Sequence, residues 1–174
     1  MAFTTLSAWV IGQQLKAVTI NLMTTAIQEL QAAVNAVGML PNSMEVGTAT
    51  ALSVANATWM LCPVATPALY TSGSGMTAVT NGVTVAATGR YMVTAAIIFA
   101  GNATGRRIVG MSAGAGPPAA QNSQGTLGSA SGNSVVITKE ISFTAGDTVA
   151  LFAYQDSTAA LNVTQRNLTV RQVG

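Results

Sequence analysis

Residues 82–99 read GVTVAATGRYMVTAAIIF, two runs of strand-forming residues on either side of the turn signal Thr88-Gly89. The second run, from Arg90 to Phe99, predicts a long strand that is apolar on both faces. One face carries Tyr91, Val93, Ala95, Ile97 and Phe99, and the other carries Met92, Ala96 and Ile98. Because an antiparallel sheet normally leaves one face in water, this strand implies a second layer or a neighbouring subunit.

The rest of the chain from residue 42 onward repeats short strand patterns separated by small-residue turns. Asn81-Gly82, between two apolar runs, predicts a tight hairpin. Residues 112–133 are rich in Gly, Ala, Ser, Gln and Pro, and they predict an exposed functional or variable loop. Further strands are expected at residues 44–54, 59–62, 76–79, 83–87, 106–111, 134–143, 148–154 and 161–173.

Residues 19–38 show helical periodicity instead. Apolar side chains recur at spacings of 3, 4, 3, 4 and 3, which is the seam of a coiled coil: Ile20, Met23, Ile27, Leu30, Val34 and Val37. Thr19 is suited to begin the helix, and Gly38 followed by Pro41 is suited to end it. The seam predicts a self-associating stem, and a single amphipathic helix docked on its own domain also fits the pattern.

Ahead of the stem, residues 1–18 are expected to be an extended leader. Three bulky apolar residues, Trp9, Val10 and Ile11, precede Gly12, and Leu15 follows. They predict insertion into a groove of another protein, or else folding back on the stem. The chain is thus expected to be mainly β, with an antiparallel jelly-roll sandwich at 42–174 preceded by the leader and one N-terminal α-helix at 19–38.

The chain has few ionisable groups: no His, one Cys, five acids and seven bases among 174 residues, although 49% of the residues are hydrophobic. It therefore offers little for acid–base, nucleophilic or metal chemistry, and we expect no enzymatic activity and no cofactor. So few charges poorly cover the surface of a monomer. The composition predicts a structural protein that hides surface against copies of itself or a larger assembly.

Individual reactive residues have structural interpretations. Cys62 is expected to be a small buried hydrophobe, and Asp147 and Asp156 are expected in turns. Arg106-Arg107 is the one basic pair. It would be a solvated strand start, pair with an acid on a neighbouring strand, or contact an acidic surface glycan, and no stripe for nucleic acid is present. The N-terminus lacks a secretion signal and the longest apolar run is too short to span a bilayer, so we expect synthesis in a host cytoplasm without membrane insertion.

Two stretches of the β region resemble the C1q/tumour-necrosis-factor (TNF) type of jelly roll. Gly82–Ala95 is similar to the family's pattern of an apolar run, G-x-Y and an alternating strand, and Ile141–Leu151 resembles its L/F-x-x-G-D-x-V-x-L turn. Leu168–Val173 corresponds to the family's last strand. Ala8–Ala17, with Asn21-Leu22, resembles a start common to tailed-bacteriophage virion proteins, although Lys16 replaces a usual Thr.

The resemblance implies a bacteriophage virion appendage: a homotrimeric fibre or spike, such as a head fibre, tail fibre or minor tail protein, anchored by its N-terminus. Its head would attach to the host surface or decorate the capsid or tail. Its partners would be itself, other virion proteins and a host cell-surface glycan. In that family the inner sheets meet at a threefold axis, which predicts a head trimer core of Tyr91, Val93, Ile97 and Phe99. The alternative is a soluble C1q-like carbohydrate-binding module.

Overall fold

The computed structural model describes residues 28, 42–64, 66–114 and 116–173. Contacts divide the chain into two units, Met1–Leu40 and Pro41–Gly174, and every described strand belongs to the second. In the first unit only Gln28 is described, and it is helical. The predicted leader, with Trp9, Val10, Ile11 and Leu15, and the predicted stem residues therefore lie outside the described residues.

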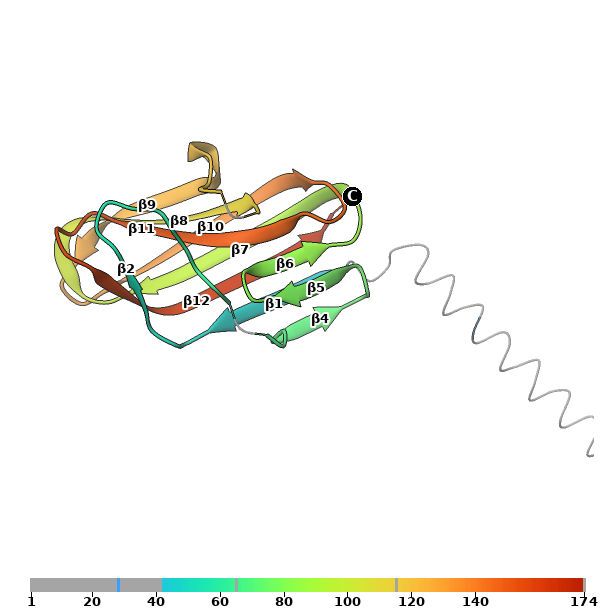
Figure 1. The fold of residues 1–174 in the computed structure, drawn as a ribbon, viewed down its shortest axis with the longest axis horizontal. Helices are drawn as coiled ribbons and strands as arrows, with labels where there is room; N and C mark the ends of the chain where they lie inside the picture. The colour runs from blue at the N-terminus through green and yellow to red at the C-terminus, as the bar shows by residue number, and fades with distance from the viewer. Residues whose placement is uncertain (1–27, 29–41, 65, 115, 174) are drawn as a thin grey trace, which may run out of the picture. The chain divides into compact units, whose positions relative to one another are not determined.

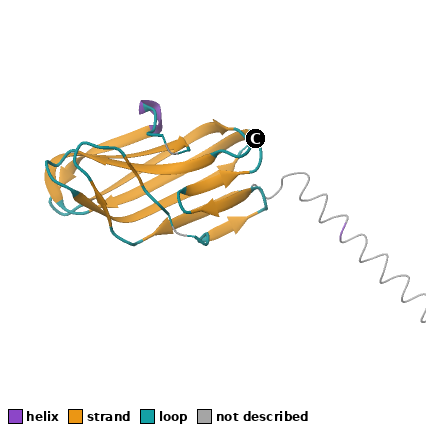
Figure 2. Cartoon of the chain, in the orientation of Figure 1, coloured by secondary structure: helices purple, strands orange, loops and turns teal. Residues whose placement is uncertain are grey.

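The second unit, which we call the head, consists of two six-stranded antiparallel sheets lying face to face (Figures 1 and 2). Sheet A has the order β10-β7-β12-β1-β4, with β2 also paired to β12. Its strands are β1 (Ser43–Thr48), β2 (Leu52–Val54), β4 (Tyr70–Ser72), β7 (Gly89–Phe99), β10 (Asn133–Phe143) and β12 (Leu161–Gln172).

Sheet B has the order β5-β6-β11-β8-β9, with β3 also paired to β11. Its strands are β3 (Met60–Leu61), β5 (Met76–Val79), β6 (Gly82–Val85), β8 (Asn102–Ala113), β9 (Ser123–Ser129) and β11 (Thr148–Gln155). A short 3₁₀ helix, Ala120–Asn122, precedes β9. In both sheets most neighbouring strands are far apart in sequence, as in a jelly roll.

The core fills the space between the sheets. In β7 every second side chain points inward, because successive residues of a strand face opposite sides. Tyr91 shows how such a residue is fixed: its hydroxyl donates to the carbonyl of Ala87 at 2.7 Å, and its ring meets that of Phe143 edge-on at 5.9 Å. Burial raises the pKa of Tyr91. The long strand predicted from the sequence is therefore confirmed, with sheet B as its second layer.

In β11, residues 149–153 are all buried, including those on the face that points away from the core. Trp59 and Pro118 cover part of this outer face, and both lie against Gly110 of the adjacent strand β8. A side chain at position 110 would come within 2.4 Å of Pro118, so the close cover requires glycine here. Among the described residues, no helix has the length and apolar character needed to cross a membrane.

The Asn81-Gly82 hairpin is confirmed, since β5 and β6 pair antiparallel up to Val79 opposite Gly82. The long loop predicted at residues 112–133 is wrong: it contains β9, which pairs with β8 along its length. Most side chains of β9 are exposed because it lies at the edge of sheet B, so its sequence lacks the alternation that marks a half-buried strand. β4, at the edge of sheet A, was missed for the same reason.

Candidate functional site

The outer face of sheet A carries a patch of exposed apolar side chains. Met92 is 37% exposed and Ile98 39% on β7, and Val136 on β10 is 51% exposed. Val136 stands opposite Ala96 in the register of the two strands, which places Ala96 between Ile98 and Met92 on the same face. We call Met92, Ala96, Ile98 and Val136 the apolar patch.

The four residues predicted for the trimer core of the head lie elsewhere. Tyr91, Val93, Ile97 and Phe99 point into the sandwich, and each is at most 1% exposed within the single chain. They have no surface left for another subunit, which corrects their assignment: they hold the two sheets together. The opposite face of the same strand carries two polar residues, Arg90 and Thr94. These residues could have indicated from the sequence that this face is exposed to solvent.

Polar side chains surround the apolar patch and are bonded to one another. Asn167 Nδ2 donates to Glu45 Oε1 at 2.6 Å, and the hydroxyls of Thr94 and Thr138 lie 2.9 Å apart. At the end of β7 an ion pair joins Arg90 and Glu140. Met92 stands between Glu140 and Arg171 in the register, whereas the cross-strand neighbours of Ala96 and Ile98 are uncharged, so this part of the face suits coverage by a second protein surface.

One further apolar side chain lies at the margin of sheet B. Leu127 of β9 is 74% exposed. Its carbonyl accepts a bond from Asn133 Nδ2 at 3.1 Å, so it lies beside the start of β10 and therefore near the edge of sheet A. The head thus presents the apolar patch on sheet A, Leu127 on the edge strand of sheet B, and Leu69 and Tyr70 at the β4 edge of sheet A. No sequence pattern pointed to Leu127, because β9 was not predicted as a strand.

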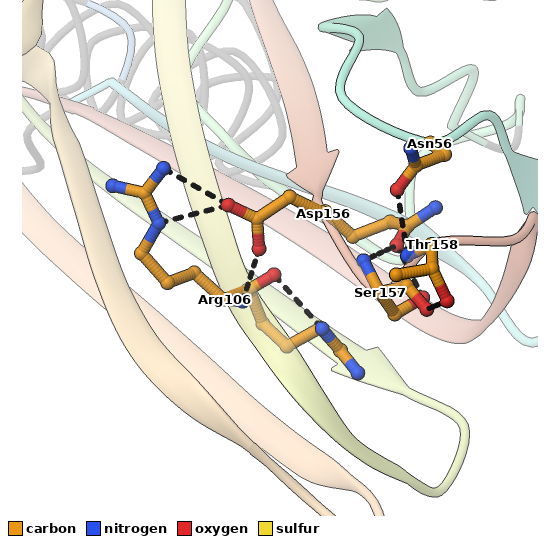
Figure 3. Close-up of polar contacts among 7 residues, drawn as sticks. Asn56, Arg106, Asp156, Ser157 and Thr158 are labelled. Carbon is orange, nitrogen blue, oxygen red and sulfur yellow. Dashed lines mark hydrogen bonds and ion pairs between the residues drawn. The ribbon is translucent and has the colours of Figure 1, made fainter.

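The basic pair lies at the end of sheet B (Figure 3). Arg106 Nη2 and Nε approach Asp156 Oδ2 at 2.9 and 3.0 Å, and the Arg106 backbone N–H donates to Asp156 Oδ1. The N–H bond, followed by the guanidinium, holds the pKa of Asp156 below its usual range. Asp156 follows β11, the strand paired with β8, so the expected pairing with an acid on a neighbouring strand is confirmed.

Arg107 points the opposite way, into the head, and is fully buried. Its Nη1 donates to the carbonyl of Arg106 at 2.9 Å and its Nη2 to that of Asn102 at 2.8 Å, while Nε has no partner. Burial lowers the pKa of Arg107. Consecutive strand residues face opposite sides, and so the pair does not form one basic surface.

The loop after β11 is held by internal hydrogen bonds, several of which Figure 3 shows. Ser157 Oγ donates to Gln155 Oε1, and Gln155 Nε2 donates to the carbonyl of Val54 at 3.0 Å. The backbone N–H of Thr158 donates to Asn56 Oδ1 at 2.8 Å. These bonds join the loop to the segment after β2, and they support a structural role for this end of the head.

The remaining candidates from the sequence are structural as well. Cys62 is a free, buried thiol, and burial raises its pKa to about 12. Asp147 closes a turn, because its Oδ2 accepts from the Thr144 N–H at 2.8 Å. Within the described part of the chain, no three His, Cys, Asp or Glu side chains gather as a metal site would require.

Solved structures of several proteins resemble the head. PRD1 vertex protein P5 superimposes with a TM-score of 0.58 at 17% identity, over 76% of this chain and 97% of that one. Murine APRIL gives 0.56 at 13% identity, over 76% and 99%. The globular domain of zebrafish complement 1qA gives 0.56 at 14% identity, over 77% and 98%. No protein-family model and no curated protein sequence matches the chain.

The head has a C1q/TNF-like jelly-roll fold. The likeness spans nearly the whole of each of these three chains, so it concerns the complete sandwich and not a shared hairpin. At such low sequence identities it establishes the fold and leaves the function to be argued from this chain's own surfaces.

Proposed function

We propose that this protein is a structural component of a tailed-bacteriophage virion, a homotrimeric fibre or spike. Its N-terminal residues anchor it in the particle, and its β head attaches to the host surface or decorates the capsid or tail. It acts by binding and not by catalysis. The observation that carries the proposal is the apolar patch on sheet A. Several exposed apolar side chains on one sheet face do not stabilise a soluble monomer, whereas they are typical of a surface that another protein covers.

The geometry of the apolar patch suits a closed ring of three heads. Leu127 lies on β9, the edge strand of sheet B, opposite Arg106, whereas the patch lies on the outer face of sheet A. When the edge of one copy packs on the face of the next, the two contact surfaces differ, and such head-to-tail contacts close into rings if the rotation allows. A ring of three would cover the apolar patch of every copy.

The virion assignment is supported by the fold and by the leader. A phage vertex protein shares the sandwich over 97% of its length. The leader resembles the start of tailed-phage virion proteins at Ala8–Ala17. A trimer with many copies on one particle would convert weak contacts of single heads into firm attachment.

Val136→Lys tests the trimer. It places a charge in the centre of the apolar patch, and Thr77→Lys on the exposed face of β5 in sheet B is the matched control. Native mass spectrometry of the full chain at micromolar concentration should give a trimer for the wild type and the control, and a lower mass for Val136→Lys. A wild-type monomer, or a Val136→Lys trimer as stable as the control, contradicts the proposal.

Deletion of residues 1–37 tests the anchor. The truncated chain should be absent from purified particles in electron-microscopy maps, while the full chain occupies its sites. Full occupancy by the truncated chain would contradict anchoring by the N-terminus. Incubation with host polysaccharide should leave its chain length unchanged, and shortening of the polymer would contradict the non-catalytic role.

A further inference from the structure

The outer face of sheet B contains a hollow of about 460 Å³ on the side of the head away from the apolar patch. It lies where β11 changes its partner from β6, opposite Ala150, to β3, opposite Phe152. The volume falls within the usual range of small-ligand pockets. The lining residues are Leu61, Val79, Thr80, Asn81, Gly114, Thr148 and Ala150.

The lining has a consistent chemical character. Leu61 and Val79 supply apolar surface above the buried Ala150, Thr80, Asn81 and Thr148 supply polar groups, and no lining side chain is ionisable. A charged ligand would lose its hydration without gaining a counter-charge. A purely apolar ligand would cover the amide and hydroxyls without hydrogen-bonding them. The pocket therefore fits a neutral ligand that combines an apolar face with several hydroxyl groups.

The hydrogen bonds around the pocket show which groups are available to a ligand. The carbonyl of Thr148 accepts from the N–H of Gly114 at 2.7 Å, and the carbonyl of Thr80 accepts from that of Val64 at 2.8 Å. The hydroxyl of Thr148 is paired with that of Thr84 at 2.9 Å. Within the described chain, the side chains of Thr80 and Asn81 have no such partner, so the hairpin turn offers a hydroxyl and a complete amide.

We propose that this pocket binds one neutral sugar residue of a surface glycan, and this inference rests on the proposed attachment function. A pyranose ring has a C–H face that matches Leu61 and Val79, and its hydroxyls match Thr80 and Asn81. Because the pocket opens on sheet B, coverage of sheet A by another copy leaves it accessible. A trimer would present three such pockets, which gives a polymer of repeated sugars much firmer attachment than one sugar alone.

Saturation-transfer NMR on the full chain tests the pocket, with glucose, galactose and N-acetylglucosamine as neutral probes and glucuronic acid as the charged comparison. At least one neutral sugar should receive saturation, and glucuronic acid should receive several-fold less. Ala150→Leu fills the floor and should reduce the signal about tenfold. Thr80→Val and Asn81→Ala remove single polar groups and should each reduce it severalfold, while Thr77→Val, on the same strand as Val79 but outside the pocket, should leave it unchanged.

The outcomes separate this inference from the proposed function. Absence of signal from every neutral sugar, or equal signal from Ala150→Leu and the wild type with both folded by circular dichroism, overturns the pocket proposal. A trimeric mass in the same sample leaves the virion proposal standing. A monomeric mass, with a sugar signal that Asn81→Ala and Ala150→Leu both reduce, supports the pocket and overturns the trimer.

Discussion

Ile97 and Ile98 are adjacent in β7 and face opposite sides of sheet A, so exchanging each for alanine separates head folding from head association. Ile97 is 0% exposed, whereas Ile98 is 39% exposed in the apolar patch. Truncating a fully buried isoleucine costs about 2–5 kcal/mol of unfolding free energy. Ile97→Ala should therefore destabilise each head by that amount, whatever the protein concentration.

Ile98→Ala should act mainly on association. Complete burial of an isoleucine side chain is worth about 1.5–3 kcal/mol, and about two-fifths of that surface is still exposed in the single head. Covering it in a trimer would contribute about 0.6–1.2 kcal/mol per subunit, or about 1.8–3.6 kcal/mol for three. The substitution should therefore raise the dissociation constant of the trimer roughly 20- to 400-fold.

Two measurements on the full chain check this pair. Urea unfolding followed by circular dichroism at two protein concentrations gives the stability, and native mass spectrometry across a dilution series gives the trimer fraction. The reasoning is refuted if Ile98→Ala leaves the dilution midpoint unchanged. It is refuted equally if Ile98→Ala lowers the unfolding free energy as much as Ile97→Ala does at every concentration.

Three further predictions concern single residues. Because burial raises the pKa of Cys62 to about 12, iodoacetamide at pH 8 should leave the folded protein unmodified and alkylate it in 6 M guanidinium chloride; mass spectrometry decides, and modification of the folded form contradicts the burial. The pKa of Asp156 is lower in the folded protein than in the unfolded chain. The stabilisation that its carboxylate gives the fold is therefore complete above the unfolded pKa near 4, and it is lost as the pH falls through the lower folded pKa. Asp156→Asn should thus lower the free energy of unfolding, measured in urea at pH 7, by less than about 1 kcal/mol and converge with the wild type near pH 2, and a difference that grows toward low pH would reverse the sign of this argument. Gly82→Ala places a Cβ 1.9 Å from the Val149 carbonyl oxygen at a φ of +151°, so it should cost more than about 2 kcal/mol, and an unchanged melting temperature would show that the hairpin shifts freely.

The long strands of the core were predictable from sequence. Strands expected at 134–143, 148–154 and 161–173 appear as Asn133–Phe143, Thr148–Gln155 and Leu161–Gln172. Each buries at least one face, and the burial imposes a period of two or an unbroken apolar run on the residues. β4 and β9 were not predicted because neither strand contains a fully buried residue, so burial imposes no alternation on their side chains, whereas the edge strand β10 buries Val135, Ile137 and Phe143.

The candidate surfaces were less accessible to sequence reasoning. The sequence of β7 is apolar on both faces, which indicated that both faces must be covered. It did not indicate which of the two faces packs against the second sheet. The apolar patch also needs Val136 opposite Ala96, which is a matter of register between strands 40 residues apart. The strand expected at 59–62 appears as β3 (Met60–Leu61), but no sequence pattern showed that β3 and β6 pair with the same strand, and the pocket on sheet B depends on this pairing.

The structure shows that some of the few charged side chains are buried. Arg107 and Arg166 are both buried, and both donate to backbone carbonyls: Arg107 to Arg106 and Asn102, and Arg166 to Pro63 and Thr50. Two of the seven bases are thus buried: Arg166 ties two loops to the sandwich, and Arg107 bonds to carbonyls of its own strand β8.

The remaining polar surface consists largely of hydroxyl and amide groups, and burying these groups costs far less free energy than burying ions. At the apolar patch, the carboxylate of Glu45 is already bonded to Asn167, and the Arg90–Glu140 pair stands at the end of β7. A second copy that covers Ile98, Ala96 and Val136 would therefore desolvate apolar groups and threonine hydroxyls without stripping water from an unpaired charge at the centre. The composition that leaves little material for catalysis is also the one that makes such an association favourable.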